Sequence, residues 1–274
     1  MTYAADRSRL TCEASQNYFF ENIDIRNALC LEKIFQKHAP THVIHFAAES
    51  HVDNSIQSPN IFLETNILGT SNLLMLAKKY ALHRFHFVST DEVYGDRLGK
   101  SLATEEAALE PSSPYAVSKA SADMLVQSFL RTYGLDITIS RVSNTYGSGQ
   151  HDEKFLPTVL KSIKNKSPIP LYGDGSAARD WLHVDDHVAG IWQIFTHAKK
   201  GSIYNIAGNE IMPNLDLVKK ILAFFGQDES LISFVMDRPG HDMLYHVSTI
   251  KIENELAFFP RKHLEDYLHE ISNI

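Results

Sequence analysis

Four short apolar runs, separated by longer stretches of helical periodicity, constrain the fold of this chain more than any other feature. The runs are HVIHF at 42–46, RFHFVS at 84–89, DITISR at 136–141 and SIYNIA at 202–207. Runs of this length that are rich in Val, Ile and Phe, with helices between them, are typical of a mainly parallel sheet with both faces covered. The sequence therefore predicts an α/β protein.

Two long helices are expected between the first three of these strands. Residues 61–81 carry apolar side chains at helical spacing, and Pro59 suits a first helical turn. Residues 114–133 repeat the pattern. Beyond residue 150 the density of Pro and Gly rises, which indicates shorter elements. We therefore expect a cofactor-binding lobe at 1–150 and a smaller, mainly substrate-binding lobe at 151–274, part of which returns to the first lobe.

Composition excludes several functional classes. The chain has 274 residues and a net charge of −7, with acidic and basic residues interspersed, so no nucleic-acid face or anionic-membrane anchor is expected. Two cysteines, Cys12 and Cys30, without a CxxC motif or a signal-peptide pattern indicate a reducing compartment, and we expect the cytoplasm. No apolar run reaches the roughly 18 residues of a membrane span. The histidines show no metal-ligand spacing, so no metal is expected.

The first reactive motif pairs a phenol with an amine. Tyr115 and Lys119 stand four residues apart at the start of the second helix, so they share one helical face. A positive charge beside a phenol lowers its pKa from ~10 toward the range in which it accepts a proton from an alcohol. YxxxK alone is a weak signal and equally describes a surface pair. Its place just after a strand that ends in Ser89 and Thr90 favours a site for hydride chemistry.

The second motif places an acid and a base side by side. Asp91 and Glu92 follow that same strand directly. They could be capping or solvated loop residues. As a reactive pair, Asp91 would be the general acid and Glu92 the general base of an elimination, with environments that separate their pKa values.

Six stretches together carry a resemblance to a known family. They are HFAAESHVD at 45–53, STDEVYG at 89–95, SPYAVSK at 113–119, RVSNTYG at 141–147, RDWLHVDD at 179–186 and DRPGHD at 237–242. In this order they resemble the nucleotide-sugar branch of the extended short-chain dehydrogenase/reductase family, most closely its dTDP-glucose 4,6-dehydratases. The resemblance covers nearly the whole chain and implies a doubly wound, Rossmann-like fold.

The resemblance also implies an activity. A lyase of this family oxidises C4 of dTDP-glucose with NAD, eliminates water across C5 and C6, and returns the hydride to C6, giving dTDP-4-keto-6-deoxyglucose in deoxysugar biosynthesis. A homodimer paired through the two long helices is expected. The catalytic residues would be Thr90, Asp91, Glu92, Tyr115 and Lys119.

Binding residues follow from the same resemblance. Those implied for NAD, besides Tyr115 and Lys119, are Thr2, Asp24, Ile25, Ala47, Ala48, Glu49, Ser50 and Thr65. Those implied for the nucleotide sugar, besides Thr90, are His51, Asn144, Lys154, Phe155, Leu156, Pro170, Tyr172, Arg179, Asn214, Arg238 and His241. Guanidinium groups suit a diphosphate because their planar donors match its oxygens.

The chain departs from the family at two places. No glycine precedes Gly69, so the GxxGxxG phosphate loop is absent, and Met1 to Ala4 resemble the stretch after the family's second strand. We expect an incomplete reading of a longer protein, rather than a decayed relative, and weak or absent NAD binding with low activity for the chain as written. Met243, Leu244 and Ser248 replace charged residues of the family, which weakens the inference about the nucleotide base.

Two alternatives to the dehydratase remain. One is a non-catalytic remnant that binds sugar nucleotides or dimerises. The other is a UDP-sugar epimerase or decarboxylase, which shares the Tyr-Lys pair but has no use for an adjoining acid and base at Asp91 and Glu92.

Overall fold

The structure is a computed structural model that describes residues 17–272, so Thr2 lies outside the described residues. Its main sheet is parallel, with the order β1-β2-β3-β7. The strands are β1 (His42–His45), β2 (Arg84–Thr90), β3 (Ile137–Val142) and β7 (Ile203–Ile206). Each corresponds to one of the four apolar runs, so the α/β, Rossmann-like prediction is confirmed. Among residues 17–272, β1 pairs with β2 alone.

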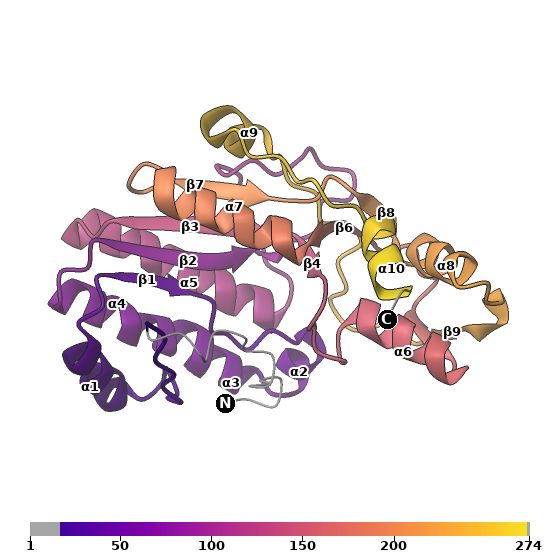
Figure 1. The fold of residues 1–274 in the computed structure, drawn as a ribbon, viewed down its shortest axis with the longest axis horizontal. Coiled ribbons are helices and arrows are strands. Elements are labelled where there is room, and N and C mark those ends of the chain that lie inside the picture. The colour runs from indigo at the N-terminus through magenta and orange to yellow at the C-terminus, as the bar shows by residue number, and fades with distance from the viewer. Residues whose placement is uncertain (1–16, 273–274) are drawn as a thin grey trace.

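Helices cover both faces of this sheet (Figure 1). The helices before β3 are α1 (Ala28–His38), α2 (Val52–Gln57), α3 (Pro59–Phe62), α4 (Thr70–Lys79) and α5 (Pro114–Tyr133). One core joins α1, α4 and α5 to side chains such as Phe85 and Ile137. The opposite face packs against α7 (Val184–His197) and α9 (Ile250–Leu256). Large apolar side chains on alternate sides of each strand therefore form two cores.

The first of the two expected long helices is present as consecutive helical segments, but its middle segment is a π-helix instead of an α-helix. Between α3 and α4 runs a π-helical segment, η2 (Leu63–Gly69). Its Asn66 donates to the Glu49 carbonyl at 3.0 Å and accepts from the Glu49 N–H at 2.9 Å, which fastens the loop after β1. A Cβ on Gly69 would lie 2.6 Å from the end of the Ile25 side chain, so a larger residue here would require that side chain to shift. Segments of π-helix are frequently found at functional sites.

The second long helix begins and ends where the sequence predicts. Ser113 caps α5 by accepting a hydrogen bond from the Ala116 N–H, Pro114 takes the first helical position, and Gly134 ends the helix in the left-handed region with φ 66°. This arrangement follows the usual preference for proline at the start and glycine just past the end.

The rest of the chain forms two small sheets with their own core. A three-stranded sheet contains β4 (Asn144–Tyr146), β6 (Ala178–His183) and β8 (Ile211–Pro213), and a two-stranded one contains β5 (Ile169–Tyr172) and β9 (Ile232–Val235). The helices packed against them are α6 (Phe155–Asn165), α8 (Asn214–Phe224) and α10 (Leu264–Ser272). Residues 17–272 also contain two short 3-10 helices, η3 (Asp91–Tyr94) and η4 (Glu229–Leu231).

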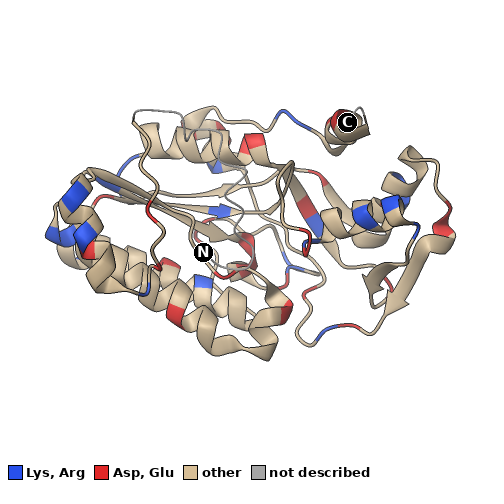
Figure 2. Ribbon diagram, turned by 60° about the horizontal axis from the view of Figure 1, so that its bottom comes forward, with Lys and Arg blue, Asp and Glu red and all other residues tan. Residues whose placement is uncertain are grey.

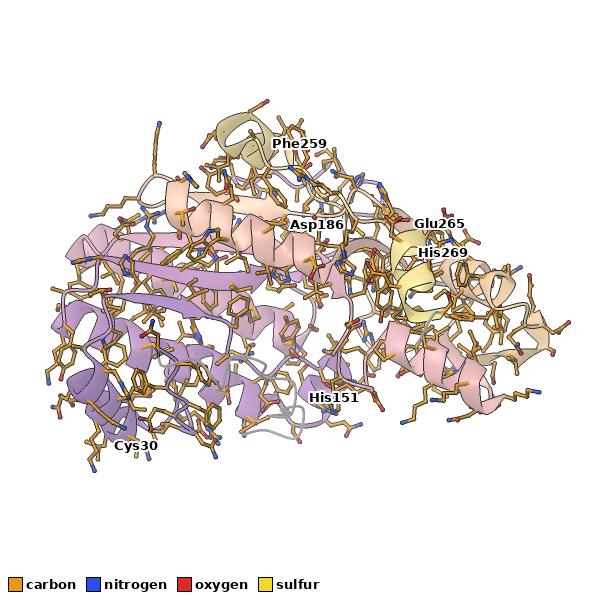
Figure 3. All side chains as sticks on the ribbon, viewed as in Figure 1. Cys30, His151, Asp186, Phe259, Glu265 and His269 are labelled. Atoms are coloured by element: carbon orange, nitrogen blue, oxygen red, sulfur yellow. The ribbon has the colours of Figure 1, made fainter. Side chains whose placement is uncertain are left out.

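Chain segments cross between the two parts of the molecule. After the small sheets begin, α7 and β7 return to the main sheet, as the sequence predicts for residues 203–206. The segment before α10 is hydrogen-bonded to the start of α7. Asp186 of α7, labelled in Figure 3, accepts hydrogen bonds from the N–H groups of Arg261 and Lys262. The two parts therefore share several connections.

Candidate active site

The site begins where β2 ends. Thr90, the last residue of β2, accepts a hydrogen bond from the Glu92 N–H at 3.3 Å and so starts η3. The Thr90 hydroxyl also donates to Asp91 at 3.2 Å. Asp91 is buried, and one of its carboxylate oxygens has no hydrogen-bond partner among the described residues. The carboxyl ends of parallel strands are where open α/β sheets place their sites.

The start of α5 brings the phenol and the amine to the same place. The Tyr115 N–H donates to the Ser55 hydroxyl of α2 at 3.1 Å, which fixes the first turn of the helix. Lys119 lies one turn further and is 4% exposed. Its ammonium donates to the Val88 carbonyl at 2.7 Å and lies 4.3 Å from the centre of the Phe87 ring. The structure brings Tyr115 and Lys119 together with Asp91 and Glu92, since all four border one cavity.

The expectation that Lys119 lowers the pKa of Tyr115 is wrong for this structure. Burial and the charge of Glu92 raise the pKa of the Tyr115 phenol, and only a hydrogen bond with Thr90 opposes them. Burial also lowers the pKa of Lys119 to about 8, with Asp123 opposing this. The ammonium is turned toward the Val88 carbonyl, which the residue spacing could not reveal.

The two carboxyl groups have different electrostatic surroundings, as the sequence predicts. Burial raises the pKa of Asp91 well above its ordinary value, and the neighbouring charges of Glu92 and Asp180 raise it further. Burial raises the pKa of Glu92 as well, but the cations of Arg179, Arg238 and Lys154 oppose it. Asp91 is therefore the better proton donor of the pair, and Glu92 is the better acceptor.

A first cavity of about 290 Å³ lies on the side of Glu92 that faces the small sheets; we call it cavity 1. Its lining contains ten of the residues implied for the nucleotide sugar. They are His51, Asn144, Lys154, Phe155, Pro170, Tyr172, Arg179, Asn214, Arg238 and His241. Leu156 is buried in the core behind this wall instead. Figure 2 shows basic and acidic residues spread over both parts of the molecule, so the three cations of this lining matter individually.

A second cavity of about 330 Å³, cavity 2, adjoins the first. Ser50, Glu92, Asn144 and Lys154 border both cavities. The catalytic candidates lie here with two residues implied for the cofactor, Ala48 and Ser50. The other described cofactor candidates, which are Asp24, Ile25, Ala47, Glu49 and Thr65, do not border it. Asp24 instead forms an ion pair with Arg26 at 2.7 Å.

Sequence reasoning missed two residues that touch the predicted site. The Tyr245 hydroxyl lies 3.4 Å from the Glu92 carboxylate and donates to Asp242 at 2.8 Å, and the Arg179 guanidinium lies 4.4 Å from the centre of the Tyr245 ring. Asp53 of α2 accepts hydrogen bonds from Tyr172 at 3.0 Å and Arg238 at 3.2 Å. Asp53 is the last residue of the stretch at 45–53 and Tyr245 follows the stretch at 237–242, but only the fold shows what these two residues face.

Metal binding and membrane insertion are two further possibilities for a chain of this size. In the part of the chain that the structure describes, no group of three or more His, Cys, Asp or Glu side chains is placed to hold a metal ion. None of the helices between residues 17 and 272 is long and apolar enough to cross a membrane.

Comparison with known proteins defines the class to which this fold and site belong. A family model described as GDP-mannose 4,6 dehydratase matches residues 2–271, and the chain belongs to this family of nucleotide-sugar dehydratases within the extended short-chain dehydrogenases/reductases.

Individual proteins are similar to this chain over most of its length. The chain is 42% identical to a dTDP-glucose 4,6-dehydratase from Haemophilus influenzae, over 98% of this chain and 86% of that protein. It is 40% identical to the crystal structure of a dTDP-glucose 4,6-dehydratase from Streptomyces venezuelae with NAD and dTDP bound, with a TM-score of 0.95 over 98% of this chain and 83% of that one. A UDP-glucose 4-epimerase from Thermotoga maritima is 28% identical, with a TM-score of 0.87 over 92% of this chain and 82% of that one.

Proposed function

We propose that this protein dehydrates dTDP-glucose to dTDP-4-keto-6-deoxyglucose, with NAD as its cofactor. The observation that carries the proposal is the meeting of two reactive pairs, Tyr115 with Lys119 and Asp91 with Glu92, in cavity 2. Relatives about 40% identical over nearly the whole chain are dTDP-glucose 4,6-dehydratases. An epimerase has no use for the acid and base at Asp91 and Glu92.

The polar side chains that line cavity 2 fit a nicotinamide cofactor. Six of its lining residues carry buried polar atoms without hydrogen-bond partners among residues 17–272; they are Ser89, Asp91, Ser143, Asn144, Gln150 and His187. Buried polar groups are normally paired, so these atoms suit a bound group with amide and hydroxyl functions. They would hold NAD together with Lys119 and the loop at 47–50. When bound, NAD supplies hydride transfer, taking a hydride from C4 and returning it to C6.

The chain's own residues supply the proton transfers. Tyr115, hydrogen-bonded to Thr90, takes the proton of the 4-hydroxyl group in its deprotonated form. Burial and the charge of Glu92 disfavour that form, and the positive charges of the Lys119 ammonium and of bound NAD would favour it. Once C4 is a ketone, the C5 proton is acidic and Glu92 removes it, and Glu92 returns a proton to C5 when the hydride adds to C6. Asp91, kept protonated by burial, gives its proton to the departing 6-hydroxyl group. Tyr245 lies 3.4 Å from Glu92 and helps to orient the base.

Cavity 1 suits the nucleotide diphosphate. Arg179, Arg238 and Lys154 face it from three different segments, beside the carboxylates of Asp53, Glu92 and Glu153. These three cations are the groups of the lining that could bind diphosphate oxygens. Most residues of cavity 1 come from beyond residue 150 and most of cavity 2 from before it. This supports the division into a mainly cofactor-binding lobe at 1–150 and a mainly substrate-binding lobe at 151–274.

We also propose a homodimer paired through η2, α4 and α5. These neighbouring helices expose large apolar side chains, namely Leu63, Leu68, Met75, Val117, Met124 and Tyr133. A second copy of the chain would cover them in a symmetric four-helix contact. Cys30 is a free thiol, which supports our expectation of a cytoplasmic location.

The test is a product assay with excess NAD. Purified protein incubated with NAD and dTDP-glucose should give the keto sugar, detected by NMR. UDP-glucose in place of dTDP-glucose should give neither a keto sugar nor an epimer at comparable rate. Epimer formation without keto sugar would contradict the proposal and favour the epimerase.

A further inference from the structure

We propose that Arg141 is a positioning residue that holds α5 and η3 in fixed register, so that oxidation and dehydration act on one sugar. The inference rests on the proposed function, since that function assigns roles to the two segments. Arg141 lies on β3, is 2% exposed, and borders neither cavity 1 nor cavity 2. Any effect on the reaction must therefore pass through the segments that it contacts.

On one side Arg141 fastens α5. Its Nε donates to one Asp123 oxygen at 2.9 Å and its Nη2 to the other at 3.1 Å, a two-point ion pair with both partners buried. Asp123 follows Lys119 by four residues and so stands directly above it on the helix. Gln127 donates a further hydrogen bond to Asp123 at 2.8 Å. The pair therefore fixes α5 one turn beyond its catalytic residues.

On the other side Arg141 fastens η3. Its Nη1 donates to the Tyr94 hydroxyl at 2.8 Å and to the Glu105 carbonyl at 3.0 Å. Tyr94 is the last residue of η3, two positions after Glu92, and its hydroxyl donates to Asn205 at 2.8 Å. Burial raises the pKa of Tyr94 to about 12, so the phenol stays protonated and keeps this bond.

The geometry requires a guanidinium. Three of its nitrogens bond simultaneously to α5, to η3 and to the segment at Glu105, and a lysine ammonium cannot reproduce this planar fork. A shift of about 1 Å between reacting groups can cost about 100-fold in rate. A residue that joins the Tyr115 segment to the Glu92 segment is therefore placed to set their relative position.

The same network contributes charge to Lys119. The carboxylate of Asp123 raises the pKa of Lys119, against burial. From the other elements packed around it, Lys119 faces Phe87 and Val88 of β2 and shares its cavity with Asp91, Glu92 and Tyr115. His45 of β1 is also near, but burial lowers its pKa to about 3, so it is neutral.

Three variants separate the two arms of the network. Arg141→Lys keeps the positive charge but loses the planar set of guanidinium donors. Tyr94→Phe removes the hydrogen bond between Arg141 and η3. Asp123→Asn removes the carboxylate charge that pairs with Arg141 on α5. Arg84→Lys is the matched control. Arg84 is also an ion-paired arginine of the main sheet and is partly buried, but its partners are Asp136 and the Phe195 carbonyl, which share no hydrogen bond with Arg141. Alanine at 141 is avoided because it would leave a buried carboxylate unpaired.

The kinetic readout follows single turnovers by the absorbance of reduced nicotinamide. Tyr94→Phe should slow elimination about tenfold with oxidation little changed, so that reduced cofactor accumulates. Asp123→Asn should slow oxidation and move the alkaline limb of the rate profile to lower pH, since Lys119 loses the charge that raises its pKa. Arg141→Lys should lower kcat by up to about 100-fold with KM little changed. Arg84→Lys should resemble the wild type.

Amide hydrogen exchange tests the same claim without activity. In Arg141→Lys and Tyr94→Phe, the amides of residues 93–95 should exchange faster, whereas Arg84→Lys should leave them unchanged. If the wild type makes no keto sugar, the proposed function fails, and the exchange result still decides the positioning claim. Unchanged exchange at 93–95, or equal kinetic losses in the Arg84 control and the network variants, would overturn it.

Discussion

At the scale of single residues, Glu92 decides between a dehydratase and an epimerase. Glu92→Gln removes the base that takes the C5 proton while keeping the size of the side chain. The overall rate should fall by roughly 10²- to 10⁴-fold, with reduced nicotinamide accumulating after oxidation. Stopped-flow absorbance measures this. Glu229→Gln, at an exposed ion pair with Lys219, is the control, and full activity of Glu92→Gln would contradict the assignment.

Lys119 should carry a measurable cost in stability. Burial lowers its pKa to about 8 in the folded protein from the ordinary 10.5, so the charged form is disfavoured by folding. That cost is fully present below pH ~8 and disappears as pH rises toward ~10.5, because the folded protein then loses its proton before the unfolded chain does.

Lys119→Met should therefore abolish oxidation yet stabilise the fold at neutral pH. The gain is at most about 3 kcal/mol at pH 7, reduced by the hydrogen bond to the Val88 carbonyl that is lost, and it should shrink toward pH 10. Urea unfolding at the two pH values measures it, with the exposed Lys161→Met as control. A variant that is less stable at both pH values would contradict this reading.

At the scale of elements, the first turn of α5 links stability to activity. Ser113→Ala removes the cap that accepts from the Ala116 N–H and should lower the free energy of unfolding by about 1 kcal/mol. Because Tyr115 lies in that turn, kcat should also fall. Urea unfolding and the product assay measure both effects. Ser128→Ala, at an exposed position of the same helix, should change neither, and equal losses in the two variants would argue against a special role for the cap.

Elements were predictable where the signals are local. The bounds of α5 follow from Ser113, Pro114 and Gly134, and the four strands of the main sheet follow from their apolar runs. The π-helical segment η2 was not foreseen, because Asn66 bonds to Glu49 across 17 residues of chain. The site residues Asp53 and Tyr245 were missed for the same reason, since their partners lie 119 and 153 residues away in the sequence. Their neighbours are set by tertiary packing.

At the scale of the whole molecule, the apolar helix face should govern assembly. Met124 on α5 is 54% exposed, and Met124→Glu should convert the proposed dimer to a monomer by placing like charges across a symmetric contact. Light scattering after size exclusion measures the mass. Met236→Glu, at a site that is 90% exposed away from these helices, should leave the dimer intact. A wild-type monomer would contradict the proposed contact.

The central claim is that one pocket oxidises, dehydrates and reduces a single hexose. It is tested most directly by giving the protein, with excess NAD, dTDP-glucose that carries deuterium at C4, and locating the label in the product by NMR. The account predicts a keto sugar with the deuterium at C6, because the hydride taken by the cofactor beside Tyr115 returns to the same sugar. A keto sugar without deuterium at C6, or no keto sugar at any NAD concentration, would contradict it.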